Sequence, residues 1–420
     1  MDIVFEILEN FMDIFWASWW FILPILLFFI VFDLWMMYIR NGFIGKIQWK
    51  LLEVSIPREI LKTPKSMEQI FASMHAVYIP PPKFIDTYWY GKMQLWVSFE
   101  IIATNGMIRF YVRTPANFVK LVESSIYAQY SNAEISEAED YINNLPSALP
   151  NQTYDLWGTE FILAKDNAYP IKTYPSFEEK EEERRIDLMA SLAEVMSSLK
   201  ADESIWIQLV LRPINDDWKK KGEGVINGIL GKKTSPKRGI IKNFFDGVFL
   251  LARNLLSAPI EVPNWEMPEG PKSTPITLSS LTRGQQDVIT SMEAKLSKLG
   301  FETTVRFLYI DKRESFSRAN VAAVMGFFRQ FNTQNMNSLK PNGEVTTFIR
   351  RGFFRKWNNF KRKRNIFWSY LGRIPGRAST ILNTEELATI HHYPEGFVIA
   401  PQLKRIETKR GSPPPNLPIE

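Results

Sequence analysis

The sequence predicts an α+β protein with a single N-terminal transmembrane helix followed by two tandem ferredoxin-like (split βαβ) modules, the second with a long insertion. Three observations lead to this prediction. A long uncharged apolar segment lies near the N-terminus, segments of strand and helix periodicity follow in the order β-α-β-β-α-β, and the same order then recurs. With 420 residues, 45% of them hydrophobic, the chain is long enough for an anchor and two or three packed modules.

The expected transmembrane helix covers residues 15–39, after a short acidic N-terminus at 1–14. Residues 15–32, FWASWWFILPILLFFIVF, carry no charge, and the apolar character continues beyond Asp33 to Ile39. About 20 apolar residues cross a bilayer as a helix, and tryptophans near both ends are typical of its interfaces. A buried core helix is the alternative. Residues 1–14 contain no Lys or Arg, unlike the start of a cleavable signal peptide.

Basic residues follow the apolar segment and indicate its orientation. They are Arg40, Lys46, Lys50, Arg58, Lys62 and Lys65. Because positive charge is enriched on the cytoplasmic side, we expect a single-pass protein of the cell (plasma) membrane. Its N-terminus would lie outside the cell and residues 40–420 in the cytoplasm.

The first module is expected over residues 45–150. Residues 93–104 alternate between apolar and polar side chains and lead into Asn105-Gly106, a strong hairpin signal. In chain order, the expected elements are a strand at 46–56, a helix at 66–78, strands at 93–104 and 107–112, a helix at 115–130 and a strand at 133–141.

The second module is expected over residues 151–395, with its hairpin loop replaced by an insertion at about 214–300. The matching elements are strands at 153–164, 204–213 and 303–310 and helices at 187–199 and 315–331. Both return strands carry an Arg-Phe pair, Arg109-Phe110 and Arg306-Phe307. A chance likeness between α+β segments is the alternative.

The folded region is expected to end with a helix over 381–394, ILNTEELATIHHYP, before a proline-rich tail at 396–420. Asn383 or Thr384 would cap this helix and Pro394 would end it. His391 and His392 would lie in its last turn, where contact with the helix dipole explains them.

Composition argues against several classes of enzyme. There is no cysteine and there are three histidines, which excludes thiolate catalysis and cysteine- or histidine-rich metal sites. GILGKKTS at 228–235 has the wrong spacing for a phosphate-binding loop. We therefore expect a protein that is not an enzyme and has no cofactor, although sites built from carboxylates alone stay open.

The insertion contains a basic amphipathic segment, KRGIIKNFFDGVFLLARNLL, at 237–256. On an anchored protein such a helix can lie in the membrane surface, although an apolar stripe more often packs against its own domain. The membrane-surface candidates are Lys237, Arg238, Lys242, Phe244, Phe245 and Phe249.

A second basic segment, at 348–373, interleaves cations with aromatic residues and has no acidic residue between 350 and 364. The candidate binding residues are Arg350, Arg351, Arg355, Lys356, Trp357, Phe360, Lys361, Arg362, Lys363 and Arg364. The mixture suits a nucleic-acid groove and equally an anionic membrane surface. A solvated basic helix with aromatic residues in the core is the third alternative. A net charge of +6 is consistent with an acidic partner.

Four segments carry a resemblance to a known group of proteins. They are IPREILKTPKSMEQIFASMHAVY, WVSFEIIATNGMIRFYVRTPANFVKLVESSIYAQYSNAEI, LNTEELATIHHYPEGFVIAPQLKRIE and PPPNLP. Together they resemble a family of membrane proteins from candidate-phyla bacteria. In its longer members a similar anchor, α+β region and proline linker precede a P-loop ATPase, similar to HerA-type and FtsK-type DNA pumps of type IV secretion and conjugation.

The resemblance implies a partner rather than an active site. By comparison with those longer members, we expect the ATPase to be a separate chain, a P-loop ATPase in trans, and the tail to correspond to its linker. The predicted function is a non-enzymatic membrane anchor and assembly subunit for a cytoplasmic DNA-translocating or type IV secretion-like ATPase, with DNA and a homo-oligomer as further expected partners. The alternative is a membrane-surface scaffold that binds anionic lipid through basic amphipathic segments, without a nucleic-acid role.

Overall fold

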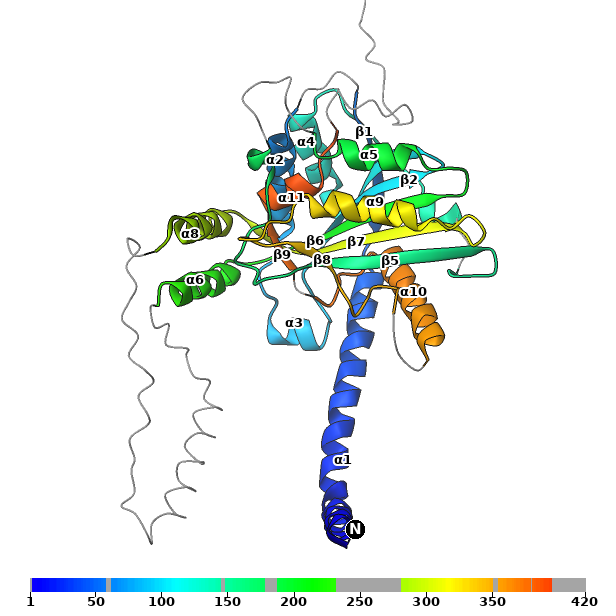
Figure 1. Cartoon of the computed structure of the whole chain (residues 1–420), viewed down its shortest axis with the longest axis vertical. Helices are drawn as coiled ribbons and strands as arrows, with labels where there is room; N and C mark the ends of the chain where they lie inside the picture. Colours follow the sequence, from blue (N-terminus) through cyan, green and yellow to red (C-terminus); the bar gives the residue numbers. More distant parts are fainter. Residues whose placement is uncertain are drawn as a thin grey trace, which may run out of the picture.

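The structure, a computed structural model, consists of one large antiparallel sheet, helices on both of its faces and one long helix that projects from it (Figure 1). It describes residues 2–57, 62–144, 148–177, 187–231, 281–349, 354–378 and 380–394. The expected α+β class with one apolar N-terminal helix is confirmed.

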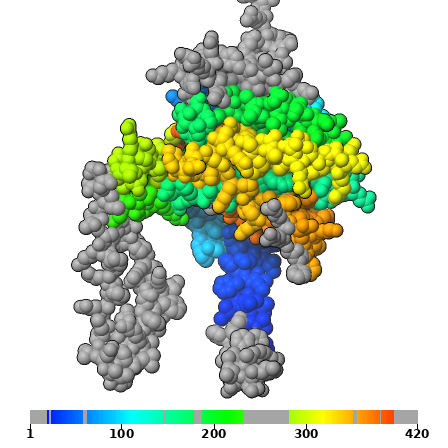
Figure 2. All heavy atoms as spheres, in the orientation of Figure 1, coloured from blue at the N-terminus to red at the C-terminus, as the bar shows by residue number. Residues whose placement is uncertain are grey.

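The projecting helix α1 (Asp2–Gly45) extends beyond the expected span at both ends. In the described part of the chain it is the one helix that is long and apolar enough to cross a membrane, over Leu23–Gly45. Side chains from Leu23 to Trp35 are exposed, whereas Met36 and Ile39 are buried. Figure 2 shows α1, in blue, standing away from the body, so its apolar surface lacks protein cover.

The sheet contains nine strands in the order β4-β1-β3-β2-β6-β7-β5-β8, with β9 paired to β7. They are β1 (Trp49–Ser55), β2 (Val97–Thr104), β3 (Met107–Pro115), β4 (Glu134–Glu137), β5 (Tyr154–Leu163), β6 (Ser204–Pro213), β7 (Gly300–Lys312), β8 (Leu339–Pro341) and β9 (Thr380–Asn383). The first half has the order β4-β1-β3-β2, and the second half repeats it as β8-β5-β7-β6. The halves meet where β2 pairs with β6.

The expected hairpin between the first module's central strands is confirmed. Thr104 pairs with Met107 across the turn. Asn105 has φ of 53° and Gly106 has φ of 79°. Positive φ at both central residues is the geometry for which Asn-Gly is preferred, because these residues tolerate the left-handed region.

The helices divide between the two faces of the sheet (Figure 1). One face is covered by α2 (Pro64–Met74), α4 (Val119–Gln129), α5 (Ala190–Ser197), α9 (Arg318–Arg329) and α11 (Thr384–Ile390). The opposite face carries α10 (Arg355–Leu371), and α3 (Phe84–Tyr88) lies on the same side, next to α1. Helices α6 (Asp217–Ile229) and α8 (Arg283–Leu296) pack together at one end. Short 3-10 helices lie at His75–Val77, Ala116–Phe118, Tyr141–Asn144 and Tyr174–Ser176.

Alternation along the strands builds two cores. Val305, Phe307 and Tyr309 of β7 join the core under the five helices, whereas Leu308 and Ile310 join the core under α10. Successive side chains of a strand point to opposite faces, so a central strand buried on both sides carries mostly apolar residues on each face. The core under α10 receives Ile366, Phe367 and Tyr370 from that helix.

A row of buried polar side chains crosses the junction between the halves. Glu100, Gln208, Arg306 and Glu160 are register partners on β2, β6, β7 and β5. The Gln208 amide donates to Glu100 at 3.0 Å, and Arg306 donates to Gln208 at 2.6 Å and to Glu160 at 3.0 Å. Because a buried charge is costly without a partner, this chain of contacts strongly favours one alignment of the two halves.

Arg373, just after α10, completes the row. Its guanidinium donates to Glu100 at 3.0 Å and to Asp140 at 2.6 Å. Burial opposes ionisation of Glu100, but Arg373 outweighs it, so the pKa of Glu100 lies below its usual value. Burial likewise opposes the charge of Arg373, yet Glu100 raises the pKa of Arg373 above its usual value.

The expected helix over 381–394 is partly wrong. Its first residues form β9, and α11 ends at Ile390. The cap is Asn383, whose side chain accepts from the Glu386 N–H while Glu386 accepts from the Asn383 N–H. Strand pairing with β7 supplies tertiary hydrogen bonds that local periodicity does not reveal.

The dipole explanation holds for one of the two histidines only. The His392 ring lies 2.9 Å from the Ala388 carbonyl. His391 is 1% exposed, neither ring nitrogen has a hydrogen-bond partner, and Phe99 is 5.5 Å away between ring centroids. Burial, followed by the nearby His392, lowers the pKa of His391 to about 3, so it serves as a neutral core ring.

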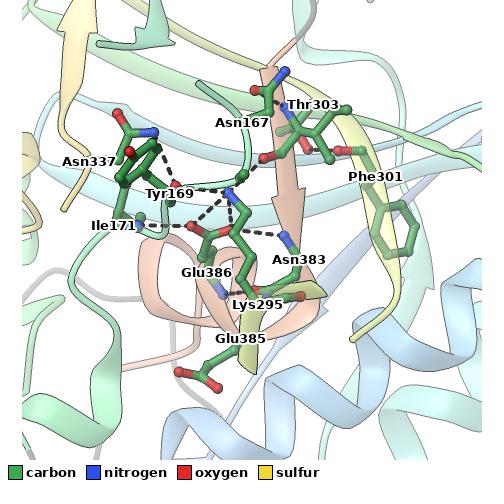
Figure 3. Close-up of polar contacts among 12 residues, drawn as sticks. Asn167, Tyr169, Ile171, Lys295, Phe301, Thr303, Asn337, Asn383, Glu385 and Glu386 are labelled. Atoms are coloured by element: carbon green, nitrogen blue, oxygen red, sulfur yellow. Dashed lines mark hydrogen bonds and ion pairs between the residues drawn. The ribbon is translucent and has the colours of Figure 1, made fainter. Parts of the chain in front are cut away.

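A buried lysine joins the end of α8 to the C-terminal elements (Figure 3). The Lys295 ammonium donates to Glu386 at 3.1 Å, to the Ile381 carbonyl at 3.1 Å and to the Tyr169 carbonyl at 3.3 Å. Both charged side chains are fully buried, and Glu386 also accepts from the Ile171 N–H at 2.9 Å. Burial lowers the pKa of Lys295 although Glu386 opposes the shift.

Lys295→Met is expected to destabilise the protein by about 3–5 kcal/mol, because it leaves the Glu386 carboxylate buried without its cation. Urea unfolding of the full chain in detergent measures this loss. Lys295→Met combined with Glu386→Leu removes both charges and should recover most of the stability. The exposed Lys120→Met is the control. If Lys295→Met were as stable as this control, the proposed stabilising role of the buried Lys295–Glu386 pair would be wrong.

Acidification is expected to destabilise the protein partly through His391. Its pKa of about 3 in the fold lies below the value of about 6.5 in the unfolded chain, so protons favour unfolding as pH falls from about 6.5 toward 3. Between pH 7 and pH 5 this contributes about 2 kcal/mol. His391→Leu should show a smaller loss of melting temperature over that interval, and an unchanged pH slope would show that His391 does not carry the effect.

Candidate functional site

The candidate site is the outer surface of α10, which lies below the sheet in Figure 1, as does the projecting part of α1. In Figure 2 the orange α10 region and the blue α1 both lie below the rest of the body. The sequence RKWNNFKRKRNIFWSYL of α10 contains no acidic residue. Its basic charge is therefore not balanced within the helix.

One face of α10 combines exposed cations and aromatic rings. Trp357 is 61% exposed and Trp368 is 51% exposed. Phe360, Lys361 and Arg364 are also exposed, and all five recur at the spacing of one helical face. Trp368 lies within the predicted 348–373 segment but was not among the candidate residues; its position eleven residues after Trp357 is the signal for it.

The cations of this face rest on its aromatic rings. The Lys361 ammonium lies 5.2 Å from the Trp357 ring centroid, and the Arg364 guanidinium lies 5.8 Å from that of Phe360. Each pair is four residues apart, as expected for side chains one turn apart on a helix. These contacts hold the cations at the surface, where they remain accessible to an anion.

Other basic residues of the predicted set point toward the protein. Arg362 donates to the carbonyls of Gly343 at 2.7 Å and Thr346 at 2.9 Å. Lys363 pairs with Asp155 of β5 at 2.6 Å. These two cations attach α10 to the body, so the prediction that they bind an external ligand finds no support in their contacts.

The first turn of α10 is electrostatically unusual. Arg355 and Lys356 occupy it and are exposed, whereas the positive end of a helix dipole favours acidic residues. The preceding Phe354 has φ of 31° and makes no side-chain cap hydrogen bond. An anion at this end would stabilise both the dipole and the two cations.

Several predicted residues fall outside the part of the chain that the structure describes. They are Arg350 and Arg351 of the basic segment and the insertion candidates Lys237, Arg238, Lys242, Phe244, Phe245 and Phe249. Of the predicted set, the structure brings Trp357, Phe360, Lys361 and Arg364 together on one surface, with Arg355 and Lys356 exposed at the beginning of the same helix.

The comparisons with known proteins concern the body rather than the anchor. No curated protein matches this chain. A family model described as "Domain of unknown function (DUF8128)" matches residues 48–403, from the first strand of the sheet to beyond α11. The match covers more than half of the chain and includes α10. The chain therefore belongs to the DUF8128 family.

Proposed function

We propose that the protein is a non-enzymatic membrane-anchored scaffold that binds anionic lipid through the exposed face of α10. The observation that carries the proposal is that this basic and aromatic face and the exposed apolar helix α1 lie at the same end of the body, below the sheet in Figure 1. A span through α1 would bring the body close to the bilayer surface with α10 facing it.

The length of α1 suits this arrangement. Residues 14–32 are free of charge between Asp13 and Asp33. At 1.5 Å per residue they extend roughly 28 Å, close to the roughly 30 Å thickness of a hydrocarbon core. The basic residues that follow favour a cytoplasmic body at the plasma membrane, where the inner leaflet carries anionic lipid.

The chemistry of α10 favours lipid over nucleic acid. Each exposed Lys or Arg near an anionic leaflet contributes about 1 kcal/mol, and tryptophan rings prefer the membrane interface. Arg355, Lys356, Lys361 and Arg364 are the exposed cations, and Trp357 and Trp368 are the exposed indoles. DNA bound to this surface would lie against the membrane and repel its anionic lipid.

We also propose that the two halves are tandem ferredoxin-like modules. Each has the element order β-α-β-β-α-β typical of that fold, and each has the same strand order in the sheet. In the second half, the insertion, which includes α6 and α8, separates β6 from β7. The modules would then join side by side through β2 and β6 as a rigid platform on the membrane.

The lipid proposal is tested with the full chain in nanodiscs. A cysteine introduced at exposed Asn358 carries an environment-sensitive fluorophore, which is specific because the chain has no native cysteine. Its emission should shift to the blue in discs with anionic lipid and much less in zwitterionic discs. Lys361→Glu with Arg364→Glu should abolish the lipid-charge dependence, because attraction becomes repulsion.

Charge reversal at Lys120 and Lys200 is the matched control, because both lysines are exposed and lie outside α10. This variant has the same net charge as the variant reversed at Lys361 and Arg364, but it should keep the blue shift in discs with anionic lipid. Identical emission in both disc types would reject lipid binding by α10. Reversal of the signal by added duplex DNA at constant salt would instead move α10 to a nucleic-acid role.

A second candidate function adds a partner to this scaffold, namely assembly of a DNA-translocating or type IV secretion-like P-loop ATPase. The resemblance of the sequence supports the class of partner. The position of Tyr393 indicates on which face of the sheet the ATPase would bind. The Tyr393 ring packs on Phe110 and Tyr130, in the core on the face opposite α10. The described part of the chain therefore ends, at Pro394, on the face opposite α10, and a homo-oligomer would present several copies of this end.

Gentle extraction of the full chain from native membranes tests this candidate. We expect a P-loop ATPase to copurify in stoichiometric amount, in a particle whose mass corresponds to more than one copy of the chain. A truncation before residue 396 should lose the ATPase while retaining membrane insertion. Recovery of a monomer without any ATPase would reject the assembly role and leave the lipid proposal untouched.

A further inference from the structure

A second aromatic surface lies beside α1, at residues 84–90, FIDTYWY, which we term the aromatic segment. It comprises α3 and the two residues that follow. Phe84 is 75% exposed, Ile85 65%, Trp89 67% and Tyr90 59%. Clustered apolar exposure on this scale typically marks an interaction surface rather than a solvated one.

The aromatic segment is attached directly to α1. The Trp35 indole donates to the Tyr88 carbonyl at 2.9 Å, and its ring lies 5.8 Å from that of Trp89. Phe32, one turn earlier on α1, lies 6.0 Å from the Tyr88 ring. The exposed rings therefore continue the apolar surface of α1 without a gap.

Gly91 allows this close approach. Its φ is 66°, and a Cβ atom at this position would lie 2.4 Å from the Ile39 carbonyl oxygen of α1. Lys92 pairs with Asp86 at 2.9 Å and donates its backbone N–H to the Asp86 carbonyl at 2.9 Å. These contacts fix the backbone of the aromatic segment against α1. Lys92 and Asp86 neutralise each other's charge, so the exposed surface of the segment is mainly aromatic.

The position of the aromatic segment along α1 indicates that its partner is the lipid bilayer. The charge-free part of α1 ends at Phe32, and Trp35 follows Asp33 by two residues. The span Leu23–Gly45 that hydropathy indicates includes Asp33 and Arg40, whereas residues 14–32 carry no charge. Because charged side chains are disfavoured in the hydrocarbon core, we place residues 14–32 there, which puts Trp35 and the rings attached to it at the level of the lipid headgroups. Tryptophan and tyrosine are enriched at this level, because their rings are apolar and their N–H and O–H groups are polar.

We propose that the aromatic segment inserts into the interfacial region of the leaflet next to α1 and so forms a lipid-binding site distinct from α10. It would recognise the headgroup and acyl-chain boundary irrespective of lipid charge. Together with α1 and α10 it provides a third point of contact, which prevents the body from tilting about a single helix. The inference rests on the proposed function in requiring that α1 spans the bilayer.

Single cysteines with an environment-sensitive fluorophore test the proposal in the full chain, reconstituted in phosphatidylcholine nanodiscs. Ile85→Cys reports on the aromatic segment, Ile30→Cys on α1, and Ser124→Cys on α4, at the opposite face of the sheet. Quenching by lipid spin-labelled near the headgroup should be at least about twofold stronger at residue 85 than at residue 124 if residue 85 lies in the interface. Iodide in solution should give the reverse order.

The three probes separate the possible failures. If residue 85 behaves as residue 124 while residue 30 is quenched by lipid, α1 is inserted and the inference is overturned. If residue 30 is also open to iodide, the membrane span itself is wrong and the proposed function fails with it. Protection of residue 85 from both quenchers, with crosslinking to a second copy, would overturn the inference in favour of a dimer contact.

Gly91→Ala provides a positional test. The added methyl group collides with the backbone of α1, so lipid quenching at residue 85 should fall toward the value at residue 124. Gly224→Ala is the control, because its Cβ would meet nothing within 4 Å. Unchanged lipid quenching at residue 85 in Gly91→Ala would show that the close approach of Gly91 to α1 does not position the aromatic segment.

Discussion

The pairing of β2 with β6 is the constraint on which the rest of the structure depends. It joins the four strands of the first half to the five of the second, which include β9, in one sheet. The buried row of Glu100, Gln208 and Arg306 crosses this junction. Apolar contacts alone tolerate some sliding of one strand past another. A charged row does not, because a shift of register would leave a carboxylate or a guanidinium buried without its partner.

A continuous sheet gives the body two different sides. The C-terminal elements hold the helix-covered side together, because Lys295 binds α11 to the end of α8 while His391 and Tyr393 enter the core of the first half. The opposite face carries α10, and α1 projects beside α3 below the sheet in Figure 1. The surfaces proposed to bind lipid and the apolar helix therefore lie at one end of the body because the sheet is continuous, not because they are close in sequence.

The basic helix α10 divides its charges between contacts with the body and an exposed surface. Arg362 and Lys363 are used to dock the helix on the sheet, whereas Lys361 and Arg364 rest on aromatic rings and face outward. The four cations are adjacent in sequence and chemically alike. Their different roles follow from the 100° rotation between successive helical residues, once one face is committed to the sheet.

The sequence by itself determined the α+β class, the apolar helix, the strand and helix order of the first half, the order β5, α5, β6, β7 and α9 in the second half, the Asn105-Gly106 hairpin, and a cap at Asn383 or Thr384. Each depends on periodicity or on contacts a few residues apart. Only the tertiary structure decided that the halves share one sheet, that residues 380–383 form a strand, which cations of α10 face outward, and that His391 is a buried neutral ring. These depend on partners tens to hundreds of residues away, and local side-chain patterns carry no information about which distant strand will supply hydrogen bonds or cover a face.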